Sequence, residues 1–145
     1  MLWFTKDKRA RMTHRYKDRA GYAARLQRDI GLYDSLPALI GITEAGFSRA
    51  QADDSEFIAL FGEPMPEHLQ LAVHLETNMW VAVRTTLEAA RNAGITAQEY
   101  ERLLPQLRHK VTTLTKILDV EAAIMYSPLR NHFIDQLVAL RKATA

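Results

Sequence analysis

The chain has 145 residues, of which 48% are hydrophobic and 25% are charged, and it contains no cysteine. This is the composition of one ordinary globular domain, and the lack of cysteine excludes disulfides, thiolate metal sites and thiol nucleophiles. No apolar run approaches the roughly 18 residues of a membrane-spanning helix, and no apolar segment typical of a signal peptide follows Lys6. We therefore expect a cytoplasmic protein.

The formal net charge of +2 hides an uneven distribution. Residues 1–28 carry nine Lys or Arg against two Asp, whereas the remaining 117 residues carry ten Lys or Arg against fifteen Asp or Glu. We expect residues 1–11 to form a basic, flexible arm and residues 12–145 to form a single helical domain.

The basic segment has several interpretations. The simplest is a solvated charged stretch, and the alternatives are a contact site for nucleic acid, for an anionic membrane surface or for an acidic protein partner. The residues predicted to contact such an anionic partner are Lys6, Lys8, Arg9, Arg11, Arg15, Lys17 and Arg19.

Apolar residues recur with a helical period along most of the chain, and clear alternation with the period of a strand is absent. The pattern predicts an all-α domain, globin-like or bundle-like, with about six or seven helices. The first is a basic helix over residues 12–33. Residues 34–65 contain Pro37, Gly41 and Gly46, and we expect short helices and turns there, with one helix starting at Thr43.

The segment 66–92 predicts one long helix or two abutting helices. An apolar stripe runs along it, but Glu76 falls inside the stripe, and Thr77 or Asn78 could cap a second helix at that point. Trp80 belongs to the stripe and is expected in the core.

The clearest helix start is at Thr96. Thr96-Ala97-Gln98-Glu99 is a capping box, and Gly94 is well placed to end the preceding helix in the left-handed conformation. A core helix of about 20 residues follows from Leu104, with a kink or a short preceding helix expected at Pro105. Ser127-Pro128 then predicts the start of a last helix, whose inward-facing residues are Leu129, Phe133, Leu137 and Leu140.

The sequence offers little for catalysis. It has no P-loop, no G-x-S-x-G or H-E-x-x-H motif and no dinucleotide-binding glycine pattern. His68 and His74 are six residues apart, about 240° around a helix, so they do not converge on one metal ion. We therefore expect a protein that is not an enzyme.

One stretch resembles a known family. Residues 115–126, Thr-Lys-Ile-Leu-Asp-Val-Glu-Ala-Ala-Ile-Met-Tyr, are similar to the last globin helix of the globin-coupled sensors, and Trp80 lies 35 residues earlier, where that family has a Trp. Arg49-Ala50-Gln51 and Leu60-Phe61-Gly62 are similar to the segment ahead of the proximal helix. The resemblance covers about residues 49–126.

The resemblance implies a non-enzymatic sensory or regulatory module that binds haem and senses a gas or a redox signal. Haem iron needs only one protein ligand, which the resemblance places at His74, with His68 as second choice. Trp80 is then expected near the cofactor, and Tyr33 and Tyr22 are candidate polar groups for the other side of the haem. A surface or partner-facing position for His74 is the competing interpretation.

A sensor without an output domain needs a protein partner, or a homodimer formed through the C-terminal helices. The alternative function is a cofactor-free helical adaptor, or a nucleic-acid-associated protein, that acts through the basic segment.

Overall fold

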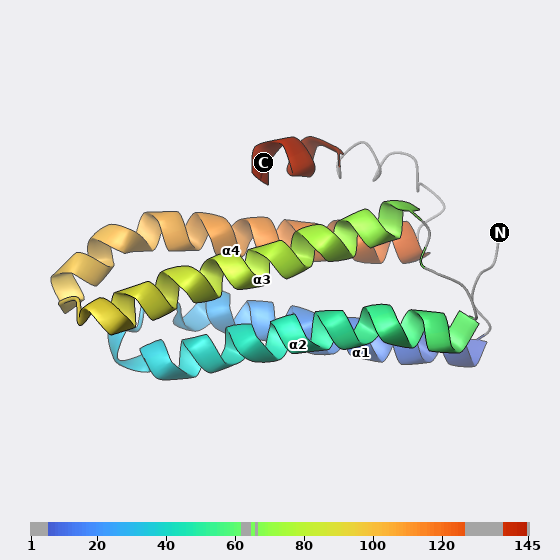
Figure 1. Ribbon diagram of the computed structural model, residues 1–145, viewed down its shortest axis with the longest axis horizontal. Helices are drawn as coiled ribbons and strands as arrows, with labels where there is room; N and C mark the ends of the chain where they lie inside the picture. The colour runs from blue at the N-terminus through green and yellow to red at the C-terminus, as the bar shows by residue number, and fades with distance from the viewer. Residues whose placement is uncertain (1–5, 62–64, 66, 127–137, 145) are drawn as a thin grey trace.

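The computed structural model describes residues 6–61, 65, 67–126 and 138–144. Four long α-helices dominate it: α1 (Lys6–Asp29), α2 (Leu36–Phe61), α3 (Glu67–Ala93) and α4 (Ala97–Tyr126). A single 3-10 turn, η1 (Tyr33–Ser35), precedes α2. The main packing pairs are α1 with α2, α2 with α3, α3 with α4 and α4 with α1, so the helices form a four-membered bundle with short connections (Figure 1).

The prediction of an all-α, bundle-like fold is confirmed for the described residues, none of which lies in a strand. The helices are longer than predicted, and within the described part of residues 6–126 there are five helical elements, one of them a single turn. Residues 138–144 are also helical. None of the described helices combines the length and the apolar character needed to cross a membrane.

The largest difference from the prediction is α2, which runs unbroken through the segment expected to be short helices and turns. Pro37 is its second residue, in the first turn, where a missing N–H costs nothing. Thr43 is an interior residue and not a helix start, since its hydroxyl donates to the Ile40 carbonyl at 2.6 Å. Gly46 lies against the ring of Trp80, where an added Cβ would come within 2.6 Å of the ring and force a shift.

The first helix begins earlier than predicted. Helix α1 starts at Lys6, so residues 6–11 of the expected arm are helical, and it ends at Asp29 instead of continuing to Tyr33. Residues 1–5 lie outside the described part of the chain.

Helix α3 has no break at Thr77 or Asn78. The single helix Glu67–Ala93 runs through both, and Thr77 donates its hydroxyl to the Val73 carbonyl at 2.8 Å instead of capping a new helix. Glu76 stays inside the buried stripe because it has partners there, as described below. Helix α4 is likewise continuous through Pro105.

The turn between α3 and α4 confirms the predicted cap. Gly94 has φ of 61°, and the Glu99 N–H donates to the Thr96 hydroxyl at 3.1 Å. The Thr96 N–H donates back to a Glu99 carboxylate oxygen at 3.2 Å, which completes the capping box. These short-range bonds fix the reversal of the chain between α3 and α4.

The core runs along the axis of the bundle and receives side chains from all four helices. Trp80 is fully buried, as predicted, in contact range of Gly46. The start of the last predicted helix, with Leu129, Phe133 and Leu137, lies outside the described residues, whereas Leu140 is half-buried and packs against the core.

Candidate binding groove and buried charge cluster

A groove of about 990 Å³ lies between α2, α3 and residues 138–144. This volume is at the upper end of the ~300–1,000 Å³ usual for small-molecule sites. Its apolar lining residues are Ala50, Ile58, Met65, Leu71, Val73 and Val138. Its polar lining residues are Gln51, Ser55, Glu67, His68, Gln70, His74, Thr77 and Arg141.

Nitrogen-bearing side chains from two sides of the groove converge on it. His68 and His74 are exposed on α3, and the exposed Arg141 comes from the terminal helical segment. The His74 Nε2 lies 3.4 Å from the Asn78 amide nitrogen, one helical turn further along α3. The groove therefore combines an apolar wall with groups that can bind an anion or a metal ion.

The residues implied for haem are not all brought together. His74 and the second-choice His68 line the groove, but Trp80 points into the core, where its indole N–H donates to Glu76 at 2.9 Å. Tyr33 lies at the far end of the bundle and donates its hydroxyl to the Ile95 carbonyl. That end is about 28 Å from His74 along α3, at about 1.5 Å per residue.

The residues predicted to contact an anionic partner separate into two groups. Five of them, Lys6, Lys8, Arg9, Arg11 and Arg15, lie in the first part of α1, and Lys17 is exposed on the same helix. Arg19 is not part of that surface, because it is 2% exposed and faces the core.

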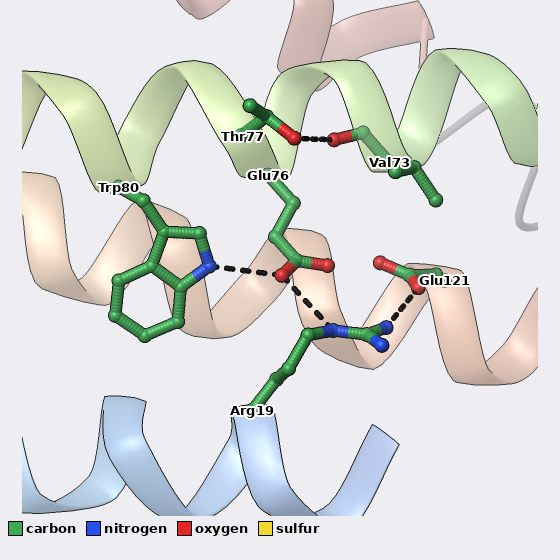
Figure 2. Close-up of polar contacts among 6 residues, drawn as sticks. All are labelled: Arg19, Val73, Glu76, Thr77, Trp80 and Glu121. Atoms are coloured by element: carbon green, nitrogen blue, oxygen red, sulfur yellow. Dashed lines mark hydrogen bonds and ion pairs between the residues drawn. The ribbon is translucent and has the colours of Figure 1, made fainter. Parts of the chain in front are cut away.

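Arg19 belongs to a buried charge cluster, which we define as Arg19 of α1, Glu76 of α3 and Glu121 of α4, together with Trp80 (Figure 2). The Arg19 Nε lies 3.0 Å from Glu76 Oε2, and its Nη2 donates to Glu121 Oε1. Trp80 donates to the same Glu76 oxygen. The cluster ties three helices together in the middle of the bundle.

Burial shifts the pKa values of the charged groups in this cluster. Desolvation raises the pKa of Glu121 well above its usual 4.5, the negative charge of Glu76 raises it further, and Arg19 only partly opposes both effects. Desolvation would lower the pKa of Arg19, but the charges of Glu121 and Glu76 outweigh it, so the guanidinium remains protonated.

The pKa of Tyr16 is also raised, in part by the same excess of negative charge. Its pKa is raised from 10.0 to about 12, first by burial and then by the charges of Asp119 and Glu121. The phenol therefore stays neutral at physiological pH.

The sequence contained one sign of this cluster, which was the acidic residue inside the apolar stripe of α3. An isolated Glu76 suggested a break in the helix, but its actual partners come from helices far away in the sequence. Trp80, four residues after Glu76 on the same helix face, is the one local partner that the spacing could have revealed.

The groove and the cluster lie on opposite sides of the same stretch of α3. His74 and Thr77 line the groove, and Glu76 between them points into the core.

Within the described ranges, no three His, Asp or Glu side chains gather as a metal site would require. Haem iron, by contrast, needs only one histidine ligand.

Comparison with known proteins gave no match: no family model, no curated protein and no solved structure is significantly similar to the chain. Its function must therefore be inferred from the groove and the buried charge cluster themselves.

Proposed function

We propose that this chain is a non-enzymatic regulatory protein that binds an amphipathic organic anion in the groove between α2, α3 and residues 138–144. One observation carries the proposal: an apolar wall faces His68, His74 and Arg141 in a single groove of about 990 Å³. Ligand sites typically combine such a wall with a few polar groups that set orientation.

The chemistry of the lining residues selects the ligand class. Ile58, Leu71 and Val73 offer contacts to an apolar body. Arg141 can bind a carboxylate through two parallel hydrogen bonds, and the histidines can donate to the same kind of group. An apolar molecule ending in a carboxylate meets both requirements.

Haem belongs to this class, because its apolar macrocycle carries carboxylates. His74 is accessible in the groove and could supply the single protein ligand that haem iron needs. Trp80 and Tyr33 take no part in this version of the proposal, since neither lies in the groove. Haem is therefore the first ligand to test for the sensory function implied by the sequence resemblance.

The position of the groove also suggests how a ligand would produce a signal. One wall is the α2–α3 pair, and the other is the terminal helical segment. A ligand held by both His74 and Arg141 would fix that segment against the bundle, and a partner protein or a second copy of the chain could recognise the fixed state.

The test is a titration of the purified protein with hemin and, separately, with a long-chain fatty acid and its uncharged alcohol. We expect the acid to bind at least tenfold more tightly than the alcohol, and Arg141→Gln to remove that difference. If hemin is the ligand, His74→Ala should abolish its Soret band.

Matched controls lie on α4, away from the groove. His109 and Arg102 are exposed there, so His109→Ala and Arg102→Gln should bind every probe as the unmodified protein does. Equal affinity for acid and alcohol, or equal losses in the groove and control variants, would refute the proposal.

A second candidate function is supported by the helical state of the basic segment. Lys6 through Lys17 belong to one continuous helix, α1, instead of the flexible arm expected for residues 1–11. Binding of this helix to an anionic polymer should weaken steeply with salt. Heparin affinity that Lys17→Gln and Arg15→Gln leave unchanged at low salt would count against it.

A further inference from the structure

The buried charge cluster holds more acid than base. Arg19, Glu76 and Glu121 are 2%, 0% and 2% exposed, so water does not screen them. With every member ionised, one guanidinium would face two carboxylates, leaving a net negative charge in the core. An uncompensated buried charge is among the most costly arrangements in a folded protein, and such groups usually neutralise instead.

The hydrogen bonds of the two carboxylates are also incomplete. Glu76 Oε2 accepts from the indole of Trp80 and faces the guanidinium of Arg19, and Glu121 Oε1 accepts from Arg19. The other oxygens, Glu76 Oε1 and Glu121 Oε2, have no hydrogen-bond partner among the described residues. Figure 2 shows these two oxygens turned toward each other across the top of the guanidinium.

Two buried carboxylate oxygens that face each other are both acceptors, so a hydrogen between them would turn their contact into a hydrogen bond. We propose that Glu76 and Glu121 form a buried proton-binding site that holds one proton between their facing oxygens at neutral pH. The bound proton lets one carboxyl donate to the other, and it leaves the cluster with one positive and one negative charge.

The proton resides on Glu121. Glu76 Oε2 accepts a hydrogen bond from the Trp80 indole and forms an ion pair with Arg19 Nε at 3.0 Å, so this carboxyl group has a neutral donor in addition to the cation. Among the described residues, Glu121 accepts a hydrogen bond only from Arg19. The raised pKa of Glu121, caused first by desolvation and then by the charge of Glu76, agrees with this assignment.

The groups that act on Glu121 come from both helices packed against α4. Helix α1 supplies Arg19 and Tyr16, and helix α3 supplies Glu76. On α4 itself, Asp119 raises the pKa of Tyr16 and so adds to the negative field around the site. Tyr16, with its pKa of about 12, contributes no charge near neutral pH.

Proton binding gives folding a defined pH dependence. Because the pKa of Glu121 is raised in the folded state, its contribution is fully present below the ordinary value of 4.5 and is lost as pH rises through the raised pKa. Within that window the folding equilibrium constant should fall by up to about tenfold per pH unit for the one proton released.

The first measurement is infrared spectroscopy of the full chain at pH 7, in which the spectrum of each variant is subtracted from that of the unmodified protein. A protonated carboxylic acid has a carbonyl band apart from that of ionised carboxylates, and we expect one such band that shifts in heavy water. It should be missing in Glu121→Gln and retained in Glu88→Gln, a control at a partly exposed glutamate of α3.

The second measurement is urea unfolding between pH 5 and pH 9. The unmodified protein and Glu88→Gln should lose stability with rising pH, and Glu121→Gln should lose less, because its amide replaces the protonated carboxyl and donates to Glu76 at every pH. Absence of the infrared band at pH 7 in the unmodified protein would overturn the proposal even if Glu121→Gln fails to fold. Identical pH slopes in the unmodified protein and Glu121→Gln would also overturn it.

Discussion

Two regions of the bundle bury polar side chains in different ways. At the end that carries the α1–α2 and α3–α4 turns, Tyr33 and Tyr100 donate their hydroxyls to the backbone carbonyls of Ile95 and Ile30, the latter at 2.6 Å. Their rings lie 5.8 Å apart at 55°. In the middle of the bundle, by contrast, the buried charge cluster joins ionisable side chains, one arginine and two glutamates.

The two arrangements differ in how strongly each one depends on the presence of all its members. A neutral hydroxyl that meets a backbone carbonyl is complete as a pair, so its loss affects one bond. The cluster is complete only when the guanidinium, both carboxyls and their hydrogens are all present. Removing one member therefore leaves the others buried without compensation, and the predictions below compare the two cases.

The largest effect is expected from Arg19→Met. The substitution leaves two buried carboxyl groups without their cation, which should lower the free energy of unfolding by about 3–5 kcal/mol. Urea unfolding at pH 7 measures it, and Lys17→Met, two residues earlier and exposed, should change stability little.

A combined variant sharpens this result. If the cost of Arg19→Met comes from stranded charge, then adding Glu76→Gln and Glu121→Gln should recover a large part of the lost stability. A loss below about 1 kcal/mol for Arg19→Met alone would show that the cluster does not depend on its arginine in the way described.

A smaller effect is expected from Gly46→Ala, which tests the packing beside the cluster. A Cβ at Gly46 would lie 2.6 Å from the ring of Trp80, the donor to Glu76, so the indole would have to shift. Overpacking of this kind costs about 1–3 kcal/mol.

The same helix offers a matched control for that substitution. At Gly41 an added Cβ meets nothing within 4 Å, so Gly41→Ala should instead raise stability by up to about 1 kcal/mol through helix propensity. Thermal unfolding of the two variants should move the midpoint in opposite directions, and a stabilising Gly46→Ala would contradict the observed packing.

The smallest effect is expected at the tyrosine end. Tyr100→Phe removes one hydrogen bond to the Ile30 carbonyl and should cost about 1 kcal/mol. Tyr22→Phe, at another half-buried tyrosine that packs against the core, is the control and should change stability less. A cost for Tyr100→Phe as large as that for Arg19→Met would remove the distinction between the two regions.

The parts of the fold that could be predicted are those determined by neighbouring residues. The capping box at Thr96 and the left-handed Gly94 depend on contacts within a few positions, and both were found in the sequence. The buried stripe of α3, including Trp80, follows from helical periodicity alone.

The rest depends on contacts between helices. Gly46 in α2 suggested a turn, because nothing nearby shows that Trp80 occupies the space beside it. Glu76 suggested a helix break, because its charged partners lie on other helices, far from it in the sequence. Arg19 and Glu121 are themselves 102 residues apart. Arg19 was grouped with the basic surface for the same reason.

The candidate site was predictable only in part. His74 was singled out from the sequence, but the groove that it lines also requires Ile58 from α2 and Arg141 from the terminal segment. No local pattern indicates that these three residues meet.

The order in which the cluster members leave the ribosome gives the buried carboxyl pair a further meaning. Arg19 emerges first and Glu76 later, so a nascent bundle of α1, α2 and α3 contains a balanced ion pair and can form without a bound proton. Glu121 enters only when α4 docks, and it brings the surplus acid. If the carboxyl pair binds its proton as proposed, docking of α4 and uptake of the proton are one event, so pH acts on this docking step of co-translational folding.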